Sequence, residues 1–190
     1  PHFNINTATL RPVFGLKAQT HSAISQIRTS LDAAHSHMGG VPSFLGEFGI
    51  PFNLVNSKAF HSGDYSRQER ALRICYEAID KLLIPHTIWN FSASNTYEDG
   101  DGWNTEDLSI WNSQTKAFRA ITAWCRPWPL KTAGIPRSVS WNHRTGLFEY
   151  HFNADPSCEE PSVISIPTLL TDDEPRFEVY KGHTKITSAR

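Results

Sequence analysis

Apolar residues at helical spacing mark three segments in the first two thirds of the chain. Between residues 21 and 38 they recur every three or four positions, and a glycine pair follows as a stop signal. A second helix is predicted for 66–83, opened by Ser66 and Glu69 as a capping box and ended by a proline. The pattern at 113–124 predicts a third helix.

Two short apolar runs lie between these helices. We expect residues 41–50 to form one buried strand and residues 87–91 to form another, with polar loops at 51–65 and 92–110. The apolar positions expected to be buried in the first strand are Val41, Phe44, Leu45, Phe48 and Ile50. Strand, loop and helix in repeated order are typical of a parallel sheet with crossover helices.

The pattern changes after the two prolines of Arg126–Pro129. Four strands are predicted beyond them: 138–141, 147–153, 162–166 and 177–180. A turn over 142–146 joins the first two as a hairpin. Phe148, Tyr150 and Phe152 alternate with polar neighbours, so one strand face is aromatic and is expected to pack in an antiparallel sandwich.

Composition excludes several classes of protein. The chain has 190 residues, 39% hydrophobic and 19% charged, which is typical of a globular protein with one ordinary domain or slightly more. A net charge of −1 provides no electrostatic footprint for nucleic acid, so no nucleic-acid partner is expected. No apolar run is long enough to span a membrane.

The cysteines and the first residues suggest a location. Three widely spaced cysteines form neither a metal motif nor a disulfide framework, which favours a reducing compartment. The chain begins at Pro1 without a methionine or a signal-like stretch, so we interpret it as a fragment that lacks the N-terminal targeting region. A cytoplasmic or vacuolar location is the expectation.

A carboxylate stands inside the first apolar run, at Glu47 between Gly46 and Gly49. An unpaired buried carboxylate costs several kcal/mol. Glu47 must therefore be paired, neutral, or at the end of the strand facing a cleft. An ordinary edge-strand glutamate beside a turn explains the local sequence as well.

Gly46–Gly49 and Trp89–Asn90 end successive predicted strands, and they resemble the last two strands of a glycoside hydrolase family 5 barrel. The run Gly100–Trp111 resembles the loop after the eighth strand in the endoglycoceramidase-like subgroup of that family. This subgroup includes fungal steryl β-glucosidases and glucosylceramidases. Pro1–Phe3 resembles the end of the sixth strand, and Arg126–Pro136 resembles the connection from barrel to sandwich.

The resemblance implies the C-terminal part of a TIM (β/α)8 barrel, about strands six to eight, followed by an incomplete antiparallel β-sandwich. Residues 1–127 would be the barrel portion, 128–136 a linker and 137–190 the start of the sandwich domain. A whole barrel needs about 250 residues, so the first five strands are expected upstream.

The resemblance also implies a retaining β-glycosidase that cleaves a glycolipid such as steryl β-glucoside or glucosylceramide, with Glu47 as nucleophile. The acid/base of this family lies in an Asn-Glu-Pro motif, which does not occur here and is expected upstream. Residues 1–190 alone are therefore expected to be inactive.

Two alternatives stay open: a family 5 β-glycanase acting on polysaccharide, and an inactive carbohydrate- or lipid-binding remnant. A peripheral contact with membrane lipid is compatible with a glycolipid substrate, and the oligomeric state is not assigned.

The same resemblance implies substrate-binding roles for His2, Trp89, Trp103 and Asn104, with Trp89 as the platform under the sugar. A frayed terminal histidine and core or loop-packing tryptophans are the alternatives. Asn4 stands where the family usually has a tyrosine that tunes the nucleophile, which favours the inactive remnant. Acidic residues in 98–107 suit a cation, a solvated rim that hydrogen-bonds sugar hydroxyl groups, or a plain surface loop; we expect no metal and no cofactor.

Overall fold

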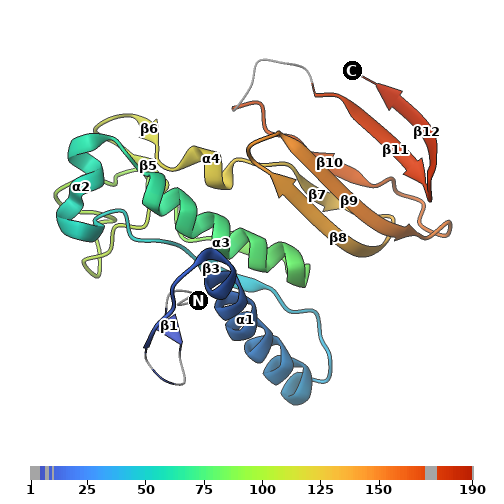
Figure 1. The fold of residues 1–190 in the computed structure, drawn as a ribbon, viewed down its shortest axis with the longest axis horizontal. Helices are drawn as coiled ribbons and strands as arrows, with labels where there is room; N and C mark the ends of the chain where they lie inside the picture. The colour runs from blue at the N-terminus through green and yellow to red at the C-terminus, as the bar shows by residue number, and fades with distance from the viewer. Residues whose placement is uncertain (1–4, 7–8, 10, 170–174, 190) are drawn as a thin grey trace.

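The computed structural model describes residues 5–6, 9, 11–169 and 175–189. Figure 1 shows helices and short strands in the first part of the chain and longer strands in the second. The elements of the first part are β1 (Ile5–Asn6), β2 (Arg11–Pro12), α1 (Leu16–Met38), β3 (Leu45–Phe48), α2 (Leu54–Ser62), α3 (Ser66–Leu82), β4 (His86–Ile88), β5 (Trp111–Asn112), β6 (Ala117–Phe118) and α4 (Ile121–Trp124). Those of the second part are β7 (Trp128–Lys131), β8 (Gly134–Asn142), β9 (Leu147–Ala154), β10 (Val163–Ser165), β11 (Phe177–Lys181) and β12 (Thr184–Ala189).

The parallel pair β3 and β4 is the centre of the first part. Leu45 lies opposite His86 and Phe48 opposite Ile88, and the backbone N–H of Trp89 donates to the carbonyl of Phe48 at 2.8 Å. Helices α2 and α3 connect the two strands, and α1 packs on α3. The predicted strand–helix repeat with parallel strands is therefore confirmed here.

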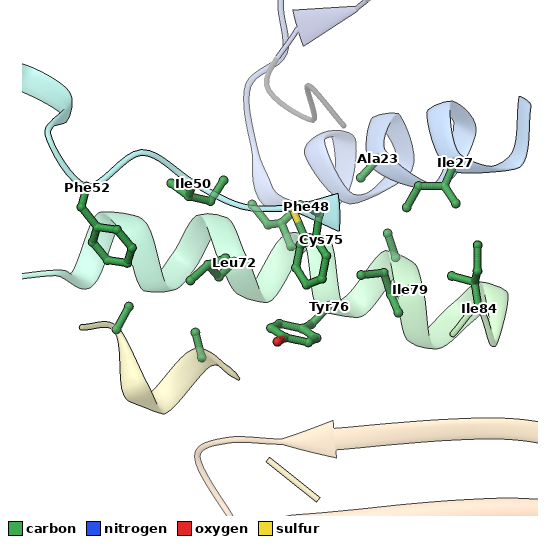
Figure 2. Packing of buried hydrophobic residues seen from close by; sticks show 14 residues of the cluster. Ala23, Ile27, Phe48, Ile50, Phe52, Leu72, Cys75, Tyr76, Ile79 and Ile84 are labelled. Atoms are coloured by element: carbon green, nitrogen blue, oxygen red, sulfur yellow. The ribbon is translucent and has the colours of Figure 1, made fainter. Parts of the chain in front are cut away.

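The core lies between α1, α3 and the end of β3. Figure 2 shows these side chains converging from the three elements. The buried members of the cluster include Ala23, Ile27, Phe48, Leu72, Cys75, Tyr76 and Ile79. Each large apolar side chain buried in this way contributes about 1.5–3 kcal/mol, and Phe48 places the β3 end firmly against α3.

Strand β3 is shorter than the apolar run predicted. Only Leu45–Phe48 are strand, and Val41 and Phe44 are 49% and 66% exposed, so the expectation of burial at these two positions is wrong. Among the described residues β3 pairs with β4 alone, so no further strand covers the chain at its other edge.

Helix α2 was not expected, since 51–65 was predicted to be a loop. Its nine residues carry little apolar periodicity, and its contacts are tertiary: Ala59 is buried, and Phe60 stacks on Tyr97 with ring centres 4.5 Å apart. A helix this short is marginal in isolation. Packing against the 92–110 loop therefore accounts for it.

The predicted capping box of α3 is wrong in its details. Ser66 is the first helical residue, and its backbone N–H donates to Oδ1 of Asp64 at 2.9 Å. This hydrogen bond lowers the pKa of Asp64. Glu69 instead pairs with Arg73 one turn later, at 3.1 Å.

The third predicted helix is also wrong for most of its length. The hairpin of β5 and β6 occupies its first half, and only α4 is helical. The buried Asn112 decides this, because its Oδ1 accepts from both the backbone N–H and the hydroxyl of Thr115 at 3.0 and 3.2 Å. Side-chain hydrogen bonds of this kind favour a turn over a helix.

The second part consists of two-stranded antiparallel pairs: β7 with β10, β8 with β9, and β11 with β12. The predicted hairpin at 142–146 is confirmed, and Tyr150 stacks on Phe152 with ring centres 5.3 Å apart. Strand β7 and the start of β8 lie in the segment predicted to be a linker, and β12 was not predicted. A sandwich of these pairs stays a prediction.

The two parts meet along α3. Arg126, at the start of the second part, pairs with Asp80 of α3 at 2.6 Å, and its guanidinium lies 5.3 Å from the ring centre of Tyr76. Tyr76 in turn meets Phe48 edge-on at 5.1 Å. Helix α3 also contacts β8.

No helix in the described ranges has the length and apolar composition to cross a membrane.

The half-buried His86 predicts a pH dependence of stability. Its ring lies 5.6 Å from Phe48 and 5.5 Å from Tyr76, and burial lowers its pKa below the ordinary 6.5. Below about pH 6.5 the unfolded chain takes up a proton that the folded chain resists. We expect thermal stability to fall as the pH drops from 7.5 towards 5.5, and the fall to be smaller in His86→Phe. Burial also raises the pKa of Asp80, which makes stability rise as the pH falls and so opposes the effect of His86. An unchanged dependence of thermal stability on pH in His86→Phe would contradict the role of His86.

Candidate functional site

Glu47 lies at the carboxyl end of β3, where its side chain is exposed and lines a cleft of about 700 Å³. Phe48, the next residue, is buried in the core and fixes the strand beneath it. With the described residues Glu47 forms no hydrogen bond or ion pair. Of the three possibilities considered for this carboxylate, the structure shows the last, a strand end that faces a cleft.

Trp89 enters the same cleft directly after β4. The two strand ends come so close that a Cβ at Gly49 would lie 2.0 Å from the carbonyl oxygen of Trp89. Only glycine leaves room for this approach. Gly49 therefore brings the residues after the two strands together, with Glu47 and Trp89 on one wall.

The Trp89 ring is held by the loop that follows it. Its Nε1 donates to Oε2 of Glu106 at 3.3 Å, and its ring meets that of Trp103 nearly edge-on at 6.1 Å. Asn104 donates from Nδ2 to Oε1 of Glu106 at 2.9 Å. Trp103 is 55% exposed. One carboxylate thus ties two of the predicted substrate-binding residues together.

Asp101 organises the backbone of this loop. Its two oxygens accept from the amides of Asn90 and Asn95, both at 2.9 Å, and from the backbone N–H groups of Leu108 and Ser109 at 2.9 and 3.2 Å. Four donors on one carboxylate give the loop a defined shape.

A buried ion pair anchors the loop from below. Arg119 and Asp107 are 1% and 3% exposed at their side chains, and Nη2 donates to Oδ1 at 2.7 Å. Arg119 Nε also donates to the carbonyl of Ser109 at 2.9 Å, and its guanidinium lies 4.1 Å from the ring centre of Phe52. Asn95 donates to the same carboxylate at 2.9 Å.

Further residues that line the cleft come from the segment after β3, from α2, from the turn that follows it and from the beginning of α3. The apolar members are Ile50, Pro51, Leu54, Ala59 and Ala71, the charged ones are Lys58, Asp64 and Arg67, and the polar ones are Ser62 and Gln68.

The structure brings Glu47, Trp89 and Trp103 together in the cleft, and links Asn104 to it through Glu106. His2 and Asn4 lie outside the described residues. The acidic loop is committed to internal hydrogen bonds, and over the described ranges no group of three or more His, Cys, Asp or Glu side chains is arranged to hold a metal.

Sequence reasoning missed the part played by Glu106, which was noted only as one of several acidic residues suited to a cation or a rim. Glu106 and Trp89 are far apart in sequence, so the sequence does not indicate that their side chains meet. An acidic residue three positions after a tryptophan in a glycine-punctuated loop is too common a pattern to single out.

Three comparisons with known proteins bear on this site. Residues 126–190 match the model of the glycoside hydrolase family 5 C-terminal domain. This last third of the chain is therefore similar to that family 5 domain. Its beginning at residue 126 is close to the change of pattern noted in the sequence, although the domain limits themselves stay predictions.

Relatives extend the similarity to the first part. A glucosylceramidase of Cryptococcus neoformans var. grubii is 30% identical over 177 residues, which cover 81% of this chain and 24% of that protein. An ergosteryl-beta-glucosidase of Saccharomyces cerevisiae is 33% identical over 117 residues, 59% of this chain and 15% of that protein. The expected resemblance to fungal steryl β-glucosidases and glucosylceramidases is confirmed.

The crystal structure of Cryptococcus neoformans sterylglucosidase 1 with tris superposes with a TM-score of 0.74 at 26% identity, over 82% of this chain and 25% of that one. The fold is thus consistent with part of a family 5 barrel followed by the family 5 domain. The chain spans about a quarter of the length of the first two curated relatives, at 24% and 26%.

The buried pair under the loop predicts a large effect of substitution. Arg119→Met leaves the Asp107 carboxylate buried without its cation, which costs about 3–5 kcal/mol of unfolding free energy. The matched control is Lys81→Met, which breaks an exposed pair with Glu77 and is expected to cost about 0.5 kcal/mol or less. Urea unfolding of both variants is the measurement, and equal losses would contradict the anchoring role.

Proposed function

We infer that this chain supplies the nucleophile and the sugar platform of a retaining β-glucosidase acting on glycolipids. The observation that carries the inference is the position of Glu47 and Trp89 at the same carboxyl edge of two parallel strands, on one cleft. In barrels of this architecture the catalytic residues come from the carboxyl ends of several strands. The fungal relatives, named glucosylceramidase and ergosteryl-beta-glucosidase, support the same reaction.

Glu47 would attack the anomeric carbon of the sugar and displace the aglycone oxygen, giving a glycosyl ester. A second carboxyl group about 5–5.5 Å away would protonate that oxygen and then act as a base towards the water that hydrolyses the ester. This second group is not assigned to a residue of this chain, which spans about a quarter of the length of its first two curated relatives. The exposed, unpaired state of Glu47 suits a nucleophile that must reach a substrate.

Trp89 would lie under the sugar, since the apolar face of an indole suits the C–H face of a pyranose. Its hydrogen bond to Glu106 and its contact with Trp103 fix the plane of the ring. Fixed geometry of this kind contributes to rate by holding the sugar close to the attacking oxygen.

The apolar members of the cleft lining support a lipid aglycone over a polysaccharide. Leu54 and Ala59 of α2 line the same cleft as Trp89 and Trp103, and their side chains offer no hydrogen bonds to further sugar units. A sterol or a ceramide buries apolar surface against such side chains. The substrate is therefore proposed to be a β-glucoside of a lipid, at a membrane surface or in a lipid assembly.

The architecture proposed with this function is a barrel portion over 1–127, a connecting segment over 128–136 and a β-sandwich beginning at 137. The antiparallel pair β8–β9 and strand β10 would supply strands of it, and β7 of the connecting segment pairs with β10. The Arg126–Asp80 pair would hold this domain against the outer helix of the barrel.

Glu47→Gln in the complete native protein is expected to lower kcat at least about 10⁴-fold with little change in substrate binding, because the nearly isosteric amide does not form the glycosyl ester. The matched control is Glu149→Gln on the exposed face of β9, for which we expect no loss. An activated 2-fluoro-glucoside should label Glu47 covalently, and labelling of another carboxylate would overturn the assignment.

The lipid preference is tested with fluorescent glucosylceramide, ergosteryl glucoside and cellohexaose. We expect kcat/KM at least about tenfold higher for the lipid glucosides, since burying even two or three methylene groups contributes more than this factor. A preference for cellohexaose would identify a polysaccharide hydrolase. Binding of all three without turnover, in a protein unaffected by Glu47→Gln, would identify a binding remnant.

A further inference from the structure

Glu106 lines the cleft but has no direct role in the reaction proposed above. It lines the cleft together with Glu47, Trp89 and Trp103, and it comes from the loop after β4. Its Oε2 accepts from Trp89 and its Oε1 from Asn104. We propose that Glu106 is the residue that recognises the sugar, by accepting hydrogen bonds from glucosyl hydroxyl groups while it holds Trp89 in place.

The Glu106 carboxylate can accept more hydrogen bonds than it accepts within the protein. Each of its oxygens has two lone-pair sites, about four in all. The two indole and amide donors occupy one site on each oxygen. One site on each oxygen is left for a ligand, and the side chain is only partly buried at the cleft wall.

The neighbours of Glu106 decide the class of ligand. Trp89 donates to it and meets the ring of Trp103 at an interplanar angle of 70°, so an apolar face and a double acceptor lie side by side. A pyranose presents the matching pair, with C–H groups on one face and hydroxyl donors around the edge. A sterol or a fatty chain has no row of donors, so Glu106 belongs to the sugar end of the cleft.

The existing contacts also limit what Glu106 does chemically. Both of its partners are N–H donors, so the geometry uses it as an acceptor and not as a proton donor to the leaving group. Its second effect is on Trp89, whose indole N–H it fixes at 3.3 Å. Glu106 is thus a positioning and specificity residue and leaves the bond-breaking step to other groups.

This role rests on the proposed glycosidase function and is tested by removing hydroxyl groups from the substrate. The assay uses nitrophenyl β-glucoside and its 3-, 4- and 6-deoxy forms with the complete native protein. A hydrogen bond to a charged group contributes roughly 1.5–3 kcal/mol, so at least one deoxy compound is expected to lose on the order of 10–100-fold in kcat/KM. In Glu106→Gln the same removal is expected to cost less than about threefold.

Two variants separate recognition from a general structural effect. Glu98→Gln is the matched control in the same loop, because Glu98 is exposed and its partner is Gln114 at 2.6 Å; it should keep the full deoxy penalty. Glu106→Ala removes the acceptor for Trp89 as well, so it should lose more kcat than Glu106→Gln, whose amide oxygen still accepts from the indole. Equal deoxy penalties in the native protein and Glu106→Gln would overturn the proposal.

A binding measurement distinguishes failure of this role from failure of the proposed function. A glucose-configured iminosugar binds the sugar end without turnover, and calorimetry gives its affinity for the native protein and for Glu106→Gln. If no glucoside is hydrolysed but the variant weakens iminosugar binding on the order of tenfold or more, recognition by Glu106 stands and the glycosidase function fails. If affinity is unchanged, the proposal about Glu106 fails whatever the activity.

Discussion

The buried pair of Arg119 and Asp107 is the interaction on which the site depends. Two charges so fully removed from water are tolerated only when hydrogen bonds satisfy them. Here the carbonyl of Ser109, the amide of Asn95 and the ring of Phe52 complete the surroundings. The loop from 92 to 119 consequently has one shape, and that shape presents Trp103 and Glu106 to the cleft. Asp101, nearer the surface, is likewise satisfied by hydrogen bonds, which it accepts from four donors.

The second constraint is the close approach of the strand ends at Gly49. Parallel strands end at the same edge of a sheet, so the pairing of β3 with β4 is enough to place Glu47 and Trp89 at one edge. The absence of a Cβ at Gly49 then closes the distance between the two segments. Arg119 thus orders the loop that carries Glu106, the hydrogen-bond partner of the Trp89 indole, and Gly49 admits the Trp89 carbonyl beside β3.

The cleft combines two surfaces of different character, which is the basis of the proposed specificity. The segment after β4 contributes rings and a carboxylate that would suit a sugar, and α2 contributes the aliphatic side chains of Leu54 and Ala59 that would suit a lipid, beside Lys58 and Ser62. Helix α2 is short and packs on Tyr97. The α2 part of the lining therefore depends on the same ordered loop as Trp89.

Much of this protein is determined by its sequence, because the relevant signals are local. The 3.6-residue periodicity located α1 and α3, alternation located the β8–β9 hairpin, and a carboxylate between glycines at a strand end pointed to Glu47. Three elements were decided by contacts between distant residues. Helix α2 is stabilised by a ring 37 positions away, the β5–β6 hairpin follows from the buried side chain of Asn112, and Glu106 meets Trp89 only because Arg119 and Asp101 fold the intervening loop. Periodicity reports which face of an element is buried, whereas hydrogen bonds between segments far apart in sequence leave no periodic trace, so only the tertiary structure reveals them.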